Sequence, residues 1–285
     1  MSATLLNGRT LSATLKAELR ADVQRFLDTY TYAPGLAIVR VEGDAASGFY
    51  SKALMKIARE VGVEARLELL PEQTAAQEFS ALLSSLNQDP RVHGIIVQMP
   101  LPAHLPQDLV TNAIAPEKDI DGISPVSAGN LALGLPGFQP STAAAVIEIL
   151  KRNEIELTGK HVVVLGRSNV VGKPLALLLL QQNATVTICH SRTPDLASFT
   201  RQADVLVAAV GRARLVTAEM VRPGATVIDV GTNALPEGGM VGDVDFDGVQ
   251  QVAGALTPVP GGVGPLTNAL LMRQCVEAAW RQAEK

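Results

Sequence analysis

A strand-like run that ends in a glycine turn and continues into an apolar helical pattern lies at residues 161–174, HVVVLGRSNVVGKP. Residues 162–165 are continuously apolar, which is typical of a parallel strand covered on both faces. Pro174 opens the LALLLLQQ pattern that follows, and proline suits the first turn of a helix. The stretch therefore predicts a strand–turn–helix unit of an α/β protein.

The turn has the outline of a nucleotide-phosphate cradle, because glycines let the backbone approach a pyrophosphate at a helix N-terminus. Its glycines are Gly166 and Gly172, while Ser168 stands where the usual G-x-G-x-x-G pattern has its second glycine. This variant predicts a dinucleotide site that includes Arg167 and Ser168 beside the two glycines. A strand-to-helix turn without a ligand is the alternative interpretation.

Apolar, strand-like runs alternate with helical patterns along the chain, which predicts parallel sheets built from βαβ units. The runs lie at residues 35–41, 64–70, 93–99, 161–166, 184–190, 204–210 and 225–231. A Pro/Gly-rich stretch at residues 131–140 separates the first three from the last four and indicates a junction between two domains. A helix over residues 141–155, capped by Ser141 or Thr142, leads into the second domain.

The domain boundary is predicted near Gln139. The first α/β domain then covers residues 1–139, and a second, Rossmann-like domain with a parallel sheet covers residues 140–265. A final helix within residues 266–285 is expected to pack back on the first domain.

Composition narrows the class of protein. A chain of 285 residues, 47% of them hydrophobic, can bury the cores of two domains. A formal net charge of -4 without basic runs argues against a nucleic-acid partner. No apolar stretch approaches the ~20 residues that cross a bilayer, so we expect no membrane contact and a cytoplasmic location. Cys189 and Cys275 are expected to be buried thiols, and the scattered histidines indicate no metal site.

The residues after the second Rossmann strand favour NADP over NAD. An NAD site places a carboxylate about 20 residues past the glycine turn, on the ribose 2′-hydroxyl. That place holds no acid here, and Ser191 and Arg192, together with Arg167, suit a 2′-phosphate. Solvated surface arginines are the alternative. Glycines at the ends of the next two strands, Gly211 in VGRAR and the glycine of DVGTN, permit close approach of a cofactor.

Three further segments combine prolines, glycines and polar residues: GDAASGFYSKALMK, VQMPLP with EKDIDGISP, and TPVPGGVGPLTNALL. Gln98, Asp119 and Asp121 follow apolar strands beside rigid prolines, as a preorganised small-molecule site requires. Turn chemistry is the alternative, and a capping role is expected for Asp119.

Together these motifs resemble the methylenetetrahydrofolate dehydrogenase/methenyltetrahydrofolate cyclohydrolase family. ASGFY, VQMPLP, KDIDG, GRSNVVGKP, DVGTN and TPVPGGVGPLT follow that family's order over essentially the whole chain, and the PGGVGP-T block is highly distinctive. The resemblance implies a homodimer of two-domain subunits, an N-terminal folate-binding and catalytic domain, and folate in the cleft between domains. It also implies that methylenetetrahydrofolate gives up a hydride to NADP, and that water opens the methenyl product to 10-formyltetrahydrofolate.

The same resemblance assigns site residues. Tyr50 matches the tyrosine that lies along the aminobenzoate part of folate, and Gln98 matches the glutamine near the reacting carbon. Asp121 matches the aspartate that pairs with the pterin ring through two hydrogen bonds. The positions that match residues lining the cleft are Pro260, Gly261 and Gly262. The positions that match the NADP side are Arg167, Ser168, Ser191 and Thr232, the last of which is isoleucine in many relatives.

One position departs from the family pattern. The family places a lysine four residues after the tyrosine, on the same helix face, where it serves the hydrolytic step, and this chain has Leu54 there. Lys52 and Lys56 are each rotated by about 200° from position 54. A leucine cannot move a proton or stabilise an oxyanion, so we expect a dehydrogenase with weakened or absent cyclohydrolase activity.

Two alternatives remain open from the sequence. In the first, Lys52 or Lys56 reaches the site because the helix begins late or is distorted, and both activities persist. In the second, the chain is a non-catalytic sensor that binds folate or NADP. The presence of Gln98, Asp121 and the glycine turn speaks against the sensor.

Overall fold

The computed structural model describes residues 2–106, 108–236 and 238–284, and the chain divides into two compact units. One unit, here the six-stranded unit, consists of residues 2–13 and Pro140–Thr267. The other, the three-stranded unit, consists of Thr14–Gln139 and residues 268–284. Helices α1 (Gly8–Tyr30) and α10 (Val263–Ala283) run along the chain from one unit into the other.

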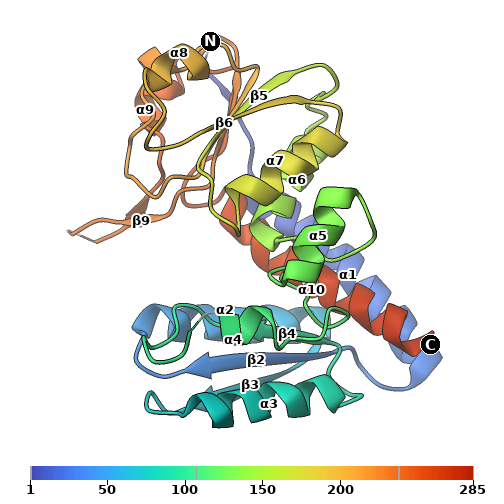
Figure 1. Ribbon diagram of the computed structural model, residues 1–285. Helices are drawn as coiled ribbons and strands as arrows, with labels where there is room; N and C mark the ends of the chain where they lie inside the picture. Colours follow the sequence, from blue (N-terminus) through green and yellow to red (C-terminus); the bar gives the residue numbers. More distant parts are fainter. Residues whose placement is uncertain (1, 107, 237, 285) are drawn as a thin grey trace. The chain divides into compact units, whose positions relative to one another are not determined.

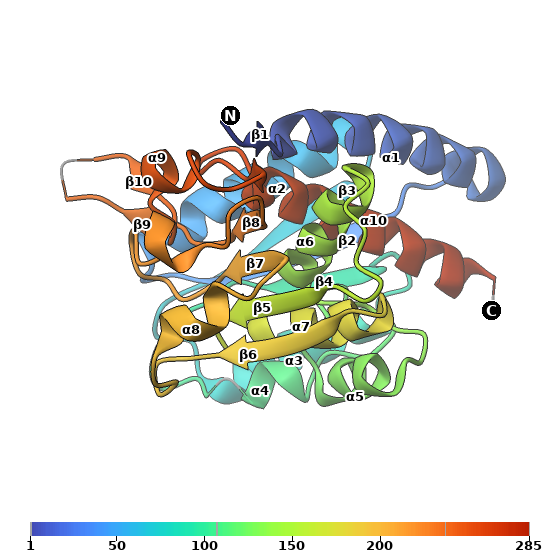
Figure 2. The same cartoon turned by 90° about the horizontal axis from the view of Figure 1, so that it is seen from above.

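The six-stranded unit is built on a parallel sheet with the strand order β1-β11-β8-β7-β5-β6. Figure 2 shows β8, β7, β5 and β6 side by side. The strands are β1 (Thr4–Leu5), β5 (His161–Leu165), β6 (Thr185–Cys189), β7 (Val205–Ala208), β8 (Thr226–Asp229) and β11 (Ala255–Leu256). From β5 onward the order is 2-1-3-4-5, which is one of the doubly wound arrangements of α/β proteins.

Helices cover both faces of this sheet. Helices α6 (Ser141–Arg152) and α7 (Gly172–Gln181) pack together, and α7 packs on β5 and β6. On the other face, α8 (Leu196–Thr200), the 3-10 turn η1 (Ala218–Met220) and α9 (Phe246–Val249) contribute apolar side chains to one core. A two-stranded hairpin, β9 (Asn233–Ala234) with β10 (Met240–Val241), completes the unit. Coverage on both faces explains why the central strand β7 is continuously apolar and buried.

The three-stranded unit has a parallel sheet with the order β3-β2-β4. Its strands are β2 (Gly35–Val41), β3 (Glu64–Leu70) and β4 (Gly94–Val97). Helices α2 (Ala45–Val61) and α3 (Ala76–Gln88) lie on opposite faces of this sheet (Figure 1). The short α4 (Asp108–Thr111) and α5 (Pro125–Leu133) follow β4 along the chain. Alternate residues of β2, beginning with Ala37, face the buried side chains of α3.

Most of the expected elements are confirmed. The runs at 35–41 and 64–70 are β2 and β3 to the residue, and the other five strands lie within their runs. The expected helix caps are wrong, because Pro140 is the N-cap of α6 and Ser141 and Thr142 already lie inside the helix. A parallel two-domain α/β fold is therefore correct, with local differences at element ends.

The N-terminus differs from the expected domain range of 1–139. Residues 2–13 belong to the six-stranded unit, because Thr4 and Leu5 pair in parallel with Ala255 and Leu256. The division after Gln139 coincides with the Pro/Gly-rich stretch. In the last helix, the Gln274 side-chain amide donates to the Ile120 carbonyl at 2.7 Å, within the three-stranded unit. Within the described ranges, no helix has the length and apolar character that crossing a membrane requires.

Candidate functional site

The glycine turn after β5 packs so closely that larger side chains would not fit. A Cβ on Gly166, which has φ +120°, would lie 2.2 Å from the Ala209 carbonyl oxygen. A Cβ on Gly172, the first residue of α7, would lie 2.1 Å from the Gly166 carbonyl oxygen. The two glycines therefore allow close packing between the end of β5, Ala209 and the start of α7. The loop between the two glycines is exposed and carries Arg167 and Ser168.

A cavity of about 410 Å³ opens beside this turn. Its walls come from the carboxyl ends of β5, β6 and β7, with further residues from α8 and the loop after β7. The lining residues are Leu165, Gly166, Arg167, Ser168, Cys189, His190, Ser191, Thr193, Leu196, Ala209, Val210, Arg212 and Leu215. The chain leaves β5 toward β6 on one side and returns to β7 on the other, so the cavity lies at the topological switch point where doubly wound sheets bind ligands.

The cavity lining favours an anionic ligand. Arg167 and Arg212 are its charged residues, and no aspartate or glutamate lines it among the residues that the structure describes. The hydroxyl groups of Ser168, Ser191 and Thr193 add hydrogen-bonding groups, and leucine and valine side chains supply an apolar wall. A nucleotide fits this lining, with its phosphates near the arginines and the flat face of its base on the apolar wall.

The structure places the other expected cofactor residues around rather than in this cavity. Gly172 lies against the turn, as described above. Arg192 is exposed, and its backbone N–H donates to His190 Nδ1 at 3.1 Å. Gly211, with φ +65°, lies next to the lining residue Arg212. Thr232 is exposed just after the β8 end. Arg212 was not among the expected site residues, although its place after a strand-end glycine is a signal for it.

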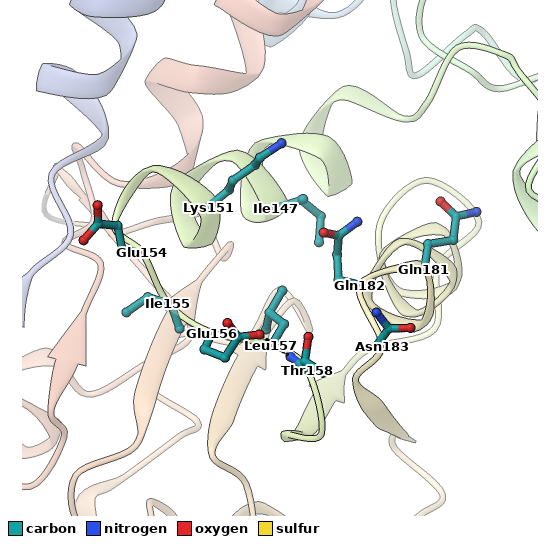
Figure 3. Close-up of a pocket in the computed structure, with 10 residues that line it drawn as sticks. All are labelled: Ile147, Lys151, Glu154, Ile155, Glu156, Leu157, Thr158, Gln181, Gln182 and Asn183. Carbon is teal, nitrogen blue, oxygen red and sulfur yellow. Dashed lines mark hydrogen bonds between the residues drawn. The ribbon is translucent and has the colours of Figure 1, made fainter.

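A second cavity, of about 360 Å³, lies between the C-terminal ends of α6 and α7 and the loop that leads to β5 (Figure 3). It is lined by Ile147, Lys151, Glu154, Ile155, Glu156, Leu157, Thr158, Gln181, Gln182 and Asn183. Figure 3 shows the Lys151 ammonium and the Glu154 carboxylate pointing away from the other lining residues. Because its charged side chains are exposed and do not converge, this cavity is not the candidate site.

In the three-stranded unit, Tyr50 lies in the second turn of α2. The helix begins at Ala45 with Asp44 as its N-cap, and Asp44 Oδ2 accepts a hydrogen bond from the Ser47 N–H at 2.6 Å. Burial, and to a lesser extent the neighbouring Asp121 carboxylate, raises the pKa of the Tyr50 phenol, although 37% of the residue is exposed. A phenol already keeps its proton at neutral pH, so Tyr50 can donate a hydrogen bond, and the raised pKa extends this to more alkaline pH.

Gln98 and Asp121 follow the same sheet. Gln98 is buried directly after β4, and its backbone N–H donates to the Val39 carbonyl at 2.8 Å. Asp121 is half-buried in the turn between Asp119 and α5, and its negative charge contributes to the raised pKa of the Tyr50 phenol. The structure thus brings Tyr50 and Asp121 near each other and anchors Gln98 at the carboxyl end of β4.

The two acidic residues of KDIDG have different roles. Asp119 is fully buried, and its carboxylate accepts hydrogen bonds from the Ile123 and Ser124 backbone N–H groups at 3.1 and 2.9 Å. It also accepts one from the Ser127 hydroxyl at 2.6 Å. These bonds hold the segment that leads into α5, but the N-cap of that helix is Ser124, whose hydroxyl accepts the Ser127 N–H at 3.1 Å, so the expected capping role of Asp119 is wrong. Asp121, which is half-buried, is the more accessible of the two carboxylates.

The neighbouring Lys118 is also structural. Its buried ammonium donates to the Leu86 and Asp89 carbonyl oxygens at 3.0 and 2.8 Å, at the C-terminal end of α3. Burial lowers the pKa of Lys118. The lysine therefore satisfies the last carbonyl groups of α3 instead of facing a ligand.

Leu54 lies on the buried face of α2. Its side chain is 0% exposed, and Ser47, Ser51 and Ala58 are buried on the same face. Lys52 and Lys56 are exposed on the same helix. α2 is helical from Ala45 onward, so the helix begins before Tyr50. Lys52 and Lys56 therefore keep their rotation of about 200° from Leu54 around the helix axis.

The PGG segment lies in the six-stranded unit, between β11 and α10. Gly261 has φ +116°, and its carbonyl oxygen accepts hydrogen bonds from the Gly8 and Arg9 backbone N–H groups at 2.9 and 3.2 Å. Gly262 is buried, and Pro260 forms a cis peptide bond with Val259. The start of α1 therefore fixes the conformation of this loop.

Comparison with known proteins gives concordant matches to both units. Residues 140–283 match the NAD(P)-binding domain, and residues 6–121 the catalytic domain, of tetrahydrofolate dehydrogenase/cyclohydrolase. A protein of Roseiflexus sp. named bifunctional protein FolD is 49% identical over 99% of this chain and 98% of its own length.

Two solved structures have the same fold. The bifunctional methylenetetrahydrofolate dehydrogenase/cyclohydrolase of Campylobacter jejuni has a TM-score of 0.96 at 44% identity, covering 98% of this chain and 99% of that one. The Trypanosoma brucei dehydrogenase-cyclohydrolase, solved with NADP and an inhibitor, has a TM-score of 0.95 at 35% identity over the full length of both chains.

Proposed function

The chain belongs to the tetrahydrofolate dehydrogenase/cyclohydrolase family, and on this basis we propose that it oxidises 5,10-methylenetetrahydrofolate to 5,10-methenyltetrahydrofolate with NADP and that its cyclohydrolase activity is weakened or lost. The observation that carries the second part is the buried Leu54 on the helix that bears Tyr50. The reaction removes a hydride from the one-carbon unit and leaves a methenyl cation.

The cavity at the ends of β5, β6 and β7 fits NADP. Its glycine turn leaves no room for a Cβ, its charged lining residues are Arg167 and Arg212, and Ser191 stands at the end of β6 where an NAD site carries a carboxylate. When bound, NADP supplies the acceptor for the hydride. The residues proposed to hold it are Gly166, Arg167, Ser168, Gly172, Ser191, Arg192, Gly211 and Thr232, with Arg212 in addition.

On the folate side, the residues proposed to act are Tyr50, Gln98 and Asp121. The protonated Tyr50 phenol donates a hydrogen bond toward the substrate, which its raised pKa supports. Gln98 orients the reacting carbon from the end of β4, and Asp121 accepts two hydrogen bonds from the pterin. Pro260, Gly261 and Gly262 are proposed to line the substrate site as well. Orientation of the two reactants is most of what hydride transfer requires from a protein.

Hydrolysis requires more. Water must be activated and the developing oxyanion stabilised, which the family's lysine would do four residues after the tyrosine. Leu54 has no group for either task. Lys52 and Lys56 are exposed on other faces of an undistorted helix, which supports the proposal that neither replaces the missing amine.

A second candidate function is the complete bifunctional reaction that ends at 10-formyltetrahydrofolate. The name of the 49% identical relative favours it. It requires that another group activates the water. A non-catalytic binding protein is a third candidate, and the presence of Gln98, which is proposed to orient the reacting carbon, speaks against it.

The dehydrogenase part is tested by mixing purified protein with methylenetetrahydrofolate and NADP and following NADPH absorbance. NADPH formation that depends on the protein and is faster with NADP than with NAD is the expected result. Binding of NADP without any turnover would favour the sensor.

We further propose a cytoplasmic homodimer. The free, buried thiols Cys189 and Cys275 support a reducing compartment, and the family resemblance supports the dimer. Light scattering of the purified chain checks the dimer, for which a molecular mass of twice 30.0 kDa is expected.

A further inference from the structure

Two buried carboxylates join the loops at the carboxyl edge of the six-stranded sheet. Asp229 ends β8 and is 3% exposed, and Asp243 follows β10 and is 0% exposed. Neither belongs to the cavity lining or to the expected site residues. Buried carboxylates are costly unless hydrogen bonds satisfy them, so their partners indicate what they do.

Asp243 binds the loop that follows β7. Its Oδ2 accepts hydrogen bonds from the Val210 and Gly211 backbone N–H groups at 2.6 and 3.0 Å, and its Oδ1 accepts one from the Arg212 N–H at 2.9 Å. Val210 and Arg212 line the nucleotide cavity. Oδ1 also accepts a bond from the Asn233 side-chain amide at 2.9 Å. Three consecutive backbone amides, two of them from residues that line the cavity, thus converge on one side chain.

Asp229 in turn fixes the segment that carries Asp243. Its Oδ1 accepts the Asp243 backbone N–H at 2.9 Å, and its Oδ2 accepts the Val244 N–H at 3.0 Å. A Cβ on Gly242 would lie 1.8 Å from Asp229 Oδ2, and a Cβ on Gly231 would lie 2.3 Å from the Asp243 carboxyl carbon. The close approach of both carboxylates to the backbone therefore depends on glycine.

We propose that Asp243, held by Asp229, is a positioning residue for the dinucleotide: it sets the conformation of the 210–212 loop and thereby the affinity for NADP. This inference rests on the proposed function. An asparagine at position 243 offers one accepting oxygen and one NH₂ group. The NH₂ group would face either the Val210 and Gly211 N–H groups or the donors of Arg212 and Asn233, and donors do not bind each other. The loop would then lose its common anchor, while the glycine turn and Arg167 stay unchanged.

The test compares Asp243→Asn with the matched control Asp204→Asn. Asp204 accepts the His161 backbone N–H at 2.9 Å from the position before β7, at the opposite edge of the same sheet. We expect the dissociation constant for NADP, measured by calorimetry, to rise about tenfold in Asp243→Asn and to change less than twofold or so in Asp204→Asn. The KM for methylenetetrahydrofolate should stay unchanged in both.

Hydrogen exchange supplies a measurement independent of activity. The amides of Val210, Gly211 and Arg212 should exchange faster in Asp243→Asn, while the amides of β5 keep their protection. If Asp243→Asn does not fold, Asn233→Ala removes one partner of the carboxylate at a half-buried position and should give a smaller change in the same direction.

The outcomes separate the two claims. A wild-type protein that does not bind NADP contradicts the proposed function. A wild-type protein that binds NADP, with unchanged affinity in Asp243→Asn or, failing that, in Asn233→Ala, overturns the positioning role and leaves the proposed function intact.

Discussion

Tyr50 and Leu54 lie one turn apart on α2, yet 37% of Tyr50 is exposed while Leu54 is buried completely. The helix therefore leaves Tyr50 partly accessible and places a buried aliphatic side chain in the next turn. A lysine at this position would have its charged form destabilised by burial, which lowers its pKa and favours a proton-accepting amine.

Replacing Leu54 by lysine should restore hydrolysis. We expect Leu54→Lys to raise the rate of methenyltetrahydrofolate hydrolysis at least about tenfold, a modest share of what general acid–base catalysis provides. The rate of NADPH formation should change much less. Leu54→Met, which keeps a similar volume without an amine, is the matched control and should leave hydrolysis unchanged. Equal effects of the two variants would show that shape, and not the amine, matters.

Arg167 should determine the preference for NADP. It lines the nucleotide cavity from the glycine turn, whereas Arg192 is exposed outside the lining. Arg167→Met is expected to weaken NADP binding about tenfold by removing a charge-assisted contact to phosphate, with a smaller effect on NAD. Calorimetry with both dinucleotides measures the difference. Arg192→Met provides the comparison, and a larger loss there than in Arg167→Met would contradict this assignment.

Asp119 should support Asp121 indirectly. Asp119→Asn replaces one of the two carboxylate oxygens that accept hydrogen bonds from Ile123, Ser124 and Ser127 by an NH₂ group. We expect the free energy of unfolding to fall by about 2 kcal/mol. The KM for methylenetetrahydrofolate should rise, since Asp121 lies in the same loop. Urea unfolding and steady-state kinetics check both effects. Glu117→Gln, at an exposed position nearby, is the control, and an equal loss of stability there would argue against the role of Asp119.

His93 should make the three-stranded unit sensitive to acid. It is buried, its Nδ1 accepts the Gly35 N–H at 2.8 Å, and burial lowers its pKa to about 4 from 6.5. The unfolded state therefore binds more protons between these values, so stability from this residue is complete above pH 6.5 and is lost as the pH falls toward 4.

The loss expected from His93 is about 3 kcal/mol across this window. In His93→Gln the free energy of unfolding should depend less steeply on pH, because glutamine does not titrate. Urea unfolding at several pH values between 4 and 7 measures both slopes. Identical slopes would show that His93 is protonated in the folded protein as easily as in the unfolded one.

The sequence predicted the fold well where local signals are strong. The apolar runs gave all seven longer strands, and those covered on both faces, such as β7, are buried throughout. β3 was found as well, although its residues are largely exposed. The two-residue strands β1 and β11 were missed, because so short a segment shows no periodicity. Their pairing joins opposite ends of the chain and places residues 2–13 in the six-stranded unit.

The candidate site was predicted in part. The glycine turn gave Gly166, Arg167 and Ser168, and the end of β6 gave Ser191, all of which line the cavity. The roles of Asp229 and Asp243 were missed, since DVGTN was interpreted only through its glycine, Asp243 lies in no motif, and the two residues meet only in the folded structure. The structural role of Lys118 was also out of reach, because the α3 carbonyl groups that it binds are distant in sequence.

The most direct test is the hydrolysis of methenyltetrahydrofolate by the purified wild-type protein, followed by absorbance and compared with the spontaneous rate under the same conditions. Formation of NADPH from methylenetetrahydrofolate in the same preparation shows that the protein is active. With Leu54 buried in place of an amine, hydrolysis should stay close to the spontaneous rate while NADPH forms readily. Rapid hydrolysis that depends on the protein would contradict this account.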